Sequence, residues 1–279
     1  MSLERIAACF AALKASRRTA LVGFLTIGDP SVEDSYACAQ AMLRAGVDVL
    51  ELGVPFSDPT ADGPVIAAAS YRAIQRGGSL RAALGVAGRL RAESEAPIVL
   101  FTYYNPVVAF GEARLPSALA EAGVDALLVV DLPPEEGAAL RAGMRARDLG
   151  MVPLITPTSG AAREQAILEA AGARGFIYYV SVTGVTGAVD VDAQGAGDPL
   201  ARAGAAAQAL SVRAGLPVVV GFGIDTPAKA RLVADQGVAG VVVGTALVNA
   251  IAEPGDSASR VERVSALVGG LRSALDAHL

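Results

Sequence analysis

Three carboxylates stand close together in the segment from Leu50 to Pro64. Glu51 ends an apolar run typical of a buried β-strand, and Asp58 and Asp62 follow in a loop that contains prolines and glycine. Glutamate is rarely buried without a partner, and apolar surroundings favour the protonated form of a carboxyl group. Such a glutamate can act as a general acid near neutral pH. The alternative is a strand-end glutamate paired with an arginine, and Glu51 taken alone is compatible with both.

The two aspartates and the tyrosine pairs also have purely structural explanations. Asp62 precedes Gly63-Pro64 and a helical pattern, so it could cap a helix, and Asp58 before Pro59 could belong to a turn. In Tyr178-Tyr179, strand alternation directs one ring into the interior. Core packing explains these two tyrosines, and equally Tyr103 and Tyr104.

Glycine-bearing turns follow the last three predicted strands, and each could bind phosphate through unobstructed backbone amides. They are Thr183–Gly187, Gly221–Ile224 and Gly244–Ala246. Barrels often hold a phosphate after strands seven and eight, although a tight strand-to-helix turn would explain any one glycine. The turns contain no lysine or arginine, so anion binding is expected to rest on amides and helix dipoles.

Scarce residue types exclude several mechanisms. The single histidine is His278, close to the end of the sequence, which excludes a Ser-His-Asp triad, a Cys-His pair or a histidine-rich zinc site. The two lysines, Lys14 and Lys229, fall in helical patterns, whereas a Schiff base requires a lysine that projects from a strand or pocket. We therefore expect chemistry based on carboxylates, tyrosines and backbone amides, without a metal.

Composition points to a cytoplasmic protein with a large core. Of the 279 residues, 53% are hydrophobic, yet no apolar run reaches the ~20 residues of a membrane span. No secretory signal is visible, and Cys9 and Cys38 lack metal or redox spacing. A net charge of −5 without a basic cluster argues against a nucleic-acid partner.

Short β-branched runs alternate with longer helical patterns along the whole chain. Glycines between a helix and the next strand, as in Ala45-Gly46-Val47-Asp48 and Ala122-Gly123-Val124-Asp125, support this repeat. We predict one (β/α)₈ TIM-barrel domain over 1–279, with an extra N-terminal helix and an additional helix between strands two and three. The loop Gly184–Asp198 is long enough to be a lid. The eight predicted strands are Ala20–Leu25, Val47–Leu50, Ile98–Phe101, Ala126–Val130, Val152–Ile155, Gly175–Tyr179, Val218–Gly221 and Gly240–Val243.

Five motifs, in order along the chain, closely resemble those of the tryptophan synthase alpha subunit family. They are LTIGDP (Leu25–Pro30), LELGVPFSDPTADGP (Leu50–Pro64), SVTGVTGA (Ser181–Ala188), GFGI (Gly221–Ile224) and VGTALV (Val243–Val248). The second motif is highly specific, whereas many phosphate-binding barrels share the glycine turns. The resemblance implies a lyase of tryptophan biosynthesis that cleaves indole-3-glycerol phosphate to indole and glyceraldehyde 3-phosphate.

The resemblance also implies roles for individual residues. Glu51 and Asp62 correspond to the catalytic carboxylates, and Tyr178 corresponds to the active-site tyrosine. The loop Pro55–Asp62 faces a beta subunit in an expected alpha2beta2 heterotetramer, and pyridoxal phosphate is expected only in that partner. The partner-facing residues are Pro55, Phe56, Ser57, Asp58 and Pro59, and the substrate- and phosphate-binding residues are Phe24, Thr186, Gly187, Phe222, Gly223, Ile224, Gly244 and Thr245.

The residues suggest how such a cleavage could proceed. We hypothesise that protonated Glu51 delivers its proton to C3 of the indole, while ionised Asp62 accepts the indole N–H. Three other interpretations stay open: a phosphosugar isomerase, a regulatory subunit without activity of its own, and a free-standing indole-glycerol-phosphate lyase. Newly ionised Glu51 is the candidate for the base that removes the glycerol hydroxyl proton.

Overall fold

The described chain folds around a single parallel sheet. The computed structural model describes residues 2–172, 174–180, 198–221 and 223–277. All pairings between neighbouring strands are parallel, in the order β5-β4-β3-β2-β1-β9-β8-β7-β6. The strands are β1 (Ala20–Thr26), β2 (Val49–Gly53), β3 (Ile98–Thr102), β4 (Ala126–Val129), β5 (Gly150–Met151), β6 (Leu154–Ile155), β7 (Ile177–Val180), β8 (Val218–Gly221) and β9 (Gly240–Val243).

The two outermost strands of that order are consecutive in the chain, so the sheet closes on itself. Only Val152 and Pro153 separate β5 from β6. The Val152 N–H donates to the Leu127 carbonyl at 2.9 Å, and the Pro153 carbonyl accepts the Tyr178 N–H at 3.0 Å. Proline has no N–H to donate, which interrupts the regular ladder here. The predicted (β/α)₈ barrel is confirmed, with its fifth strand divided in two and beginning at Gly150.

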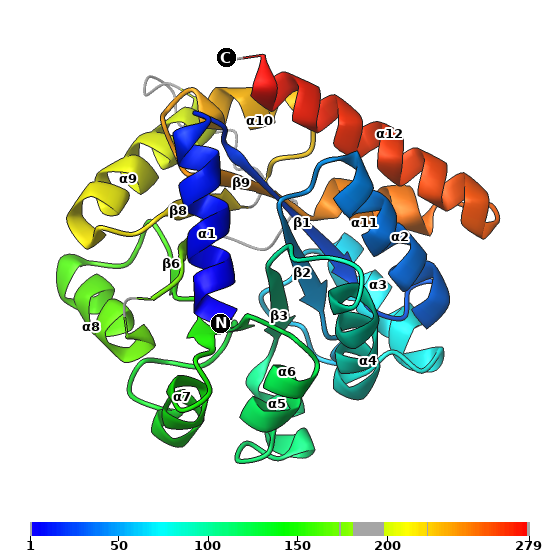
Figure 1. Ribbon diagram of the computed structural model, residues 1–279, viewed down its shortest axis with the longest axis horizontal. Coiled ribbons are helices and arrows are strands. Elements are labelled where there is room, and N and C mark those ends of the chain that lie inside the picture. The colour runs from blue at the N-terminus through cyan, green and yellow to red at the C-terminus, as the bar shows by residue number, and fades with distance from the viewer. Residues whose placement is uncertain (1, 173, 181–197, 222, 278–279) are drawn as a thin grey trace.

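Helices surround the strands on the outside (Figure 1). The extra N-terminal helix is α1, and α3 and α4 are the two helices between β2 and β3, so both predicted additions are present. The helices are α1 (Ser2–Ala15), α2 (Val32–Ala45), α3 (Pro64–Gln75), α4 (Leu80–Arg91), α5 (Tyr104–Phe110), α6 (Leu115–Glu121), α7 (Ala138–Arg145), α8 (Ala161–Ala171), α9 (Pro199–Ala214), α10 (Pro227–Ala234), α11 (Thr245–Ala252) and α12 (Ser257–Asp276).

Strand alternation divides the apolar residues into two cores. One face of the strands packs on the surrounding helices, for example through Leu50 and Tyr179. The opposite face fills the barrel interior, and it includes Phe24, Val99 and Tyr178. The alternation therefore directs Tyr178 inward and Tyr179 outward, as the sequence predicts for one residue of the pair.

Helix α1 closes the N-terminal end of the barrel. It lies across the strands in Figure 1, and its side chains Ile6, Phe10 and Leu13 belong to the interior core. The ring centroids of Phe10 and Phe176 are 5.4 Å apart. With this end covered, the interior is accessible from the C-terminal ends of the strands, where barrel enzymes hold their active sites.

Two further predictions concern membrane spans and the loop predicted to be a lid. In the part of the chain that the structure describes, no helix combines the length and apolar character needed to cross a membrane. The predicted lid, Gly184–Asp198, lies outside the described residues except for Asp198. That aspartate caps α9, where its side chain accepts the Leu200 N–H at 2.8 Å.

Candidate active site

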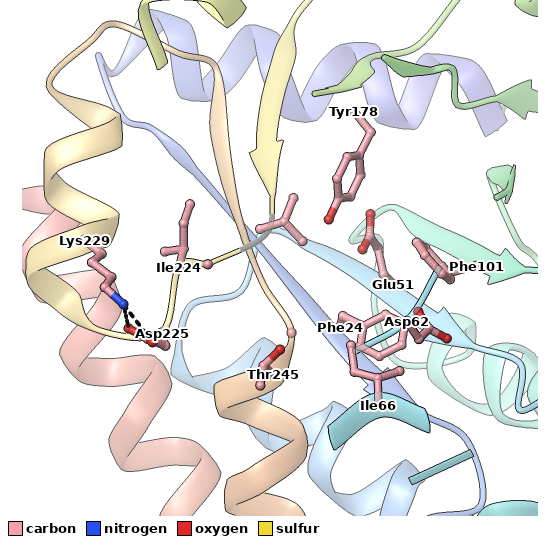
Figure 2. A pocket seen from close by; sticks show the side chains of 13 residues that line it. Phe24, Glu51, Asp62, Ile66, Phe101, Tyr178, Ile224, Asp225, Lys229 and Thr245 are labelled. Atoms are coloured by element: carbon pink, nitrogen blue, oxygen red, sulfur yellow. Dashed lines mark hydrogen bonds and ion pairs between the residues drawn. The ribbon is translucent and has the colours of Figure 1, made fainter. Parts of the chain in front are cut away.

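Glu51 lies inside the barrel, where its exposure is 1%. It pairs with Phe24 of β1 on one side and with Val99 of β3 on the other. Both neighbours belong to the interior core, so the register of three strands fixes the glutamate among apolar side chains. Figure 2 shows the carboxyl group of Glu51 and the ring of Tyr178 pointing toward one another. Glu51 is thus a buried polar group at the centre of the barrel.

Among the described residues, no arginine pairs with the Glu51 carboxyl. Its Oε1 atom is buried, and no described residue forms a hydrogen bond with it. Burial alone raises the pKa of this carboxyl to about 8, because removal of water penalises the charged form. The alternative of a glutamate–arginine pair is therefore wrong within the described residues. At neutral pH Glu51 carries a proton that it can donate.

Asp62 reaches the same pocket from the loop between β2 and α3. Gly63 is the N-cap of α3 and no side chain caps this helix, so the helix-capping explanation of Asp62 is wrong. Burial raises the pKa of the Asp62 carboxyl to about 6, while a hydrogen bond with Tyr103 acts in the opposite direction. Asp62 is half-buried and ionises more readily than Glu51. The two carboxyls therefore differ in protonation near pH 7.

Tyr178 of β7 completes this side of the pocket, where its side chain is buried. Its pKa is raised well above the ordinary value by burial, and by the carboxyls of Glu51 and Asp62. A methyl group at Gly221 would overlap the Tyr178 hydroxyl, so the glycine at the end of β8 makes room for it. The phenol stays protonated and can orient a substrate or a carboxyl.

The glycine turns form the opposite side of the same pocket. Gly223 and Ile224 follow β8, and Gly244 and Thr245 follow β9 at the beginning of α11. Gly223 has a φ of +77°, a conformation that residues with side chains rarely adopt. Figure 2 shows Ile224 and Thr245 across the pocket from Glu51 and Asp62. Backbone amides near a helix N-terminus are thus available to an anion.

Lys229 places an ammonium group on the side of the pocket that the glycine turns form. It lies in the first turn of α10 and lines the pocket together with Asp225. Its Nζ is 2.8 Å from Oδ1 of Asp225, and the pair is drawn with dashed lines in Figure 2. The turns themselves contain no lysine or arginine, but Lys229 stands beside them, paired with Asp225. The sequence could have indicated this position of Lys229, because Lys229 follows the Gly221–Ile224 turn closely and the first turn of such a helix lies at the active-site end.

The pocket brings together most of the predicted site residues and leaves others apart. Thr186, Gly187 and Phe222 lie outside the described residues. The residues predicted to face a partner, Pro55, Phe56, Ser57, Asp58 and Pro59, occupy the loop before Asp62; Ser57 and Asp58 are exposed, whereas Pro55 is buried. Eight predicted residues line one pocket: Phe24, Glu51, Asp62, Tyr178, Gly223, Ile224, Gly244 and Thr245.

Several lining residues carried no signal in the sequence. Ile66, Phe101 and Val242 form part of the apolar wall, and the rings of Phe24 and Phe101 meet edge to face at 5.3 Å. Apolar residues of this kind resemble ordinary core positions until the register of the strands is known. Together they offer a surface for a flat apolar ring between the carboxyls.

A buried carboxyl without a partner costs stability, so its presence in a barrel pocket is typical of an enzyme. The fold and the pocket are those of a barrel enzyme, with two carboxyls of different pKa in one pocket. The family model described as "Tryptophan synthase alpha chain" matches residues 10–276. The chain therefore belongs to the tryptophan synthase alpha chain family.

Individual relatives agree with this assignment over nearly the whole chain. A tryptophan synthase alpha chain from Xanthomonas campestris pv. campestris (strain B100) is 45% identical, and the match covers 98% of each chain. The crystal structure of tryptophan synthase subunit alpha from Legionella pneumophila str. Paris has a TM-score of 0.85 at 33% identity, with 98% of both chains covered. A structure of Mycobacterium tuberculosis tryptophan synthase has a TM-score of 0.84 at 34% identity and covers 97% of this chain and 98% of its own.

Family membership confirms the predicted activity. The chain is a carbon–carbon lyase of tryptophan biosynthesis, and its reaction is the cleavage of indole-3-glycerol phosphate to indole and glyceraldehyde 3-phosphate. The phosphosugar isomerase interpretation is thereby removed.

Proposed function

We propose that Glu51 and Asp62 carry out this cleavage as an acid–base pair. Protonated Glu51 gives its proton to C3 of the indole ring, and the positive charge spreads to the ring nitrogen. Ionised Asp62 accepts a hydrogen bond from the indole N–H and stabilises that charge. Glu51, now a carboxylate, takes the proton of the glycerol hydroxyl beside the scissile bond. The carbon–carbon bond then breaks, and its electron pair returns to the ring.

The observation that carries this proposal is the difference between the two carboxyls. Glu51 is buried without a partner and has a pKa raised to about 8, whereas the pKa of half-buried Asp62 is raised to about 6. Near pH 7 the first is the acid and the second is the anion, as the two steps require. The mechanism returns to Glu51 the proton that it gave, so each cycle leaves the enzyme unchanged.

Tyr178 and the apolar wall are assigned to substrate orientation. The ring of Tyr178 points toward Glu51, and Phe24 and Phe101 form an edge-to-face pair next to Asp62 (Figure 2). An indole ring placed against these side chains would present C3 to Glu51 and N–H to Asp62. Exclusion of water strengthens the interactions of both carboxyls with the ring.

The glycine turns are assigned to the phosphate. Gly223, Ile224, Gly244 and Thr245 line the side of the pocket remote from the carboxyls, and Lys229 adds an ammonium group there. We assign the same role to Thr186, Gly187 and Phe222 on the strength of the resemblance. Binding energy from a phosphate remote from the breaking bond can hold the substrate in register.

We also propose a partner and a setting for the enzyme. The exposed residues Ser57 and Asp58 lie in the loop that leads to Asp62, so a beta subunit bound there would contact the active-site end of the barrel. The reaction uses the indole ring as its electron sink and needs no cofactor in this chain, and pyridoxal phosphate would belong to the beta partner in an alpha2beta2 complex. Residues 1–279 act as one domain. Free Cys9 and Cys38 suit the reducing cytoplasm.

The test replaces Glu51 by glutamine, which keeps the size of the side chain and removes its acid. General acid–base catalysis is typically worth ~10²–10⁴ in rate, so E51Q should lose at least 100-fold in indole release. Binding of glycerol phosphate, measured by calorimetry, should stay within about twofold because the phosphate turns are remote from Glu51. A variant that keeps more than about a tenth of wild-type turnover would contradict the assignment.

The same assay separates the remaining alternatives. Indole release is measured for the chain alone and after addition of a purified beta subunit. Stimulation and co-elution of the two chains support the proposed complex. Full activity alone without co-elution would identify a free-standing lyase.

A further inference from the structure

Tyr103 joins the loop before α3 to the end of β3. It directly follows β3, and its side chain is only 2% exposed. Its hydroxyl oxygen accepts the N–H of Ala61 at 3.0 Å, and the phenol is close enough to the neighbouring Asp62 carboxyl to lower the pKa of that carboxyl. One phenol thus contacts both the backbone of the loop and the side chain at its end.

The chemistry of a phenol gives these two contacts a direction. A tyrosine hydroxyl has one hydrogen to donate, and its oxygen can accept. Because the Ala61 N–H occupies the oxygen as a donor, the hydroxyl hydrogen is available to the Asp62 carboxylate. The hydrogen bond favours the ionised carboxyl, which is the form assigned to catalysis. Tyr103 therefore supports both the position and the charge of Asp62.

The ring of Tyr103 contacts the same loop a few residues earlier. The ring centroids of Phe56 and Tyr103 are 5.2 Å apart, and the planes are inclined by 33°. Ahead of Phe56, the Val54 N–H donates to the Phe101 carbonyl at 2.8 Å. The loop is held against the end of β3 at its beginning, its middle and its end. A displacement of Phe56 would therefore be transmitted through the Tyr103 ring to its hydroxyl.

We propose that Tyr103 is a positioning residue that holds Asp62 in its catalytic orientation and makes that orientation depend on how the loop 55–61 packs. The proposal rests on the proposed role of Asp62 and adds a residue that never touches the reacting atoms. It also names the route, from Phe56 through Tyr103 to Asp62, by which a molecule bound to the exposed loop would affect cleavage.

Other charged and titratable groups also face this position. Glu51 of β2 and Tyr178 of β7 line the same pocket as Asp62, and Lys229 and Asp225 stand across it. Asp131, which follows β4, acts on Tyr103 electrostatically and disfavours ionisation of its phenol. Tyr103→Phe leaves the chemical identity of these groups unchanged, so a change in the titration of Asp62 would report the loss of the Tyr103 hydroxyl and of its contact with the Ala61 N–H.

The test is Tyr103→Phe, which keeps the ring against Phe56 and removes only the hydroxyl. Because the substitution removes a hydrogen bond to a charged group, we expect kcat to fall about tenfold and KM to change less than about twofold. The acidic limb of the pH–rate profile should move to higher pH, because Asp62 loses a bond that favours its ionised form. A Y103F enzyme with wild-type kcat and an unmoved acidic limb would overturn the proposal.

Two variants complete the design. Tyr104→Phe is the matched control, since the adjacent hydroxyl contacts Glu112 at 3.0 Å outside the pocket and its loss should change neither kcat nor the pH profile. Phe56→Ala keeps the Tyr103 hydroxyl and should move the acidic limb in the same direction as Y103F but less. An unmoved limb in F56A would overturn the link to the loop.

Asp62→Asn separates this proposal from the one on which it rests. If D62N keeps its activity, the role of Asp62 itself is wrong. If D62N is inactive while Y103F matches the wild type in a folded state verified by circular dichroism, only the role of Tyr103 is wrong.

Discussion

Buried carboxylates occur at both ends of this barrel, and those of Asp125 and Glu51 have opposite surroundings. At the N-terminal ends of the strands, half-buried Asp48 and buried Asp125 are surrounded by arginines and backbone donors. Toward the C-terminal ends, Glu51 lies in apolar surroundings, with one oxygen to which no described group forms a hydrogen bond. The same chemical group thus stabilises one end of the molecule and prepares the other for a reaction.

The N-terminal carboxylates repeat one arrangement in two places. Asp48 accepts the Leu21 N–H at 2.8 Å and pairs with Arg272 of α12 at 3.0 Å. Asp125 likewise accepts the Ile98 N–H at 2.8 Å, and it pairs with Arg91 at 2.7 Å and with Arg5. Each aspartate ties its own strand to the preceding one and to a helix. Hydrogen-bonded and paired in this way, a buried charge can be retained without excessive cost.

Structural acids and acids proposed to be catalytic can be distinguished in a barrel of this kind. Burial alone does not distinguish them, because Asp125 and Glu51 are both almost completely inaccessible. The distinguishing feature is whether hydrogen bonds and opposite charges satisfy the carboxyl. Three measurements test this distinction.

The largest of these effects is expected for Asp125→Asn. Loss of the charge leaves Arg91 and Arg5 without their partner, and breaking a buried pair of this kind typically costs about 3 kcal/mol or more. Urea denaturation should show this loss in the free energy of unfolding. The folded fraction should cleave its substrate at close to the wild-type rate. A stable D125N enzyme with E51Q-like inactivity would reverse the comparison.

Glu51→Gln should affect stability in the opposite sense, increasingly so as the pH rises. The pKa of Glu51 is raised from 4.5 to about 8 in the folded chain, so folding retains a proton that the unfolded chain releases between these values. Wild-type stability should therefore fall relative to E51Q by up to ~1.4 kcal/mol per pH unit across this range. Parallel stability curves for the two proteins would show that Glu51 is already ionised in the folded state.

The smallest expected effect is the shape of the pH–rate profile. Asp62 must be ionised and Glu51 must be protonated, so kcat/KM should rise as the pH passes about 6 and fall as it passes about 8. Outside this window the rate should change about tenfold per pH unit. E51Q, measured through its residual activity, should lose the alkaline limb and keep the acidic one. A wild-type profile that stays flat up to pH 10 would exclude Glu51 as the acid.

The repeated Ala-Gly-Val-Asp segments show the limit of local patterns. Their glycines predict helix ends, and Gly46 does adopt the left-handed conformation with a φ of +114°. The role of the aspartates could not be read from the repeat, because their arginine partners come from α1, α4 and α12. Arg272 is 224 residues away from Asp48 along the chain. Pairing over such separations depends on how the helices pack.

What the sequence determined by itself is local: apolar alternation and glycine turns located the strands, and the LELGVPFSDPTADGP motif identified Glu51 and Asp62. The packing of the folded chain was needed to show that no described arginine pairs with Glu51, that Lys229 lines the same pocket as the glycine turns, and that the Tyr103 hydroxyl binds the backbone beside Asp62. It also showed the sheet closing through Val152 and Pro153. Strands and turns can be predicted locally because the tendency to form them depends on residues that are near one another in the chain. The register of the closed sheet and the packing of its loops bring together residues that are distant in sequence, so these contacts cannot be predicted locally.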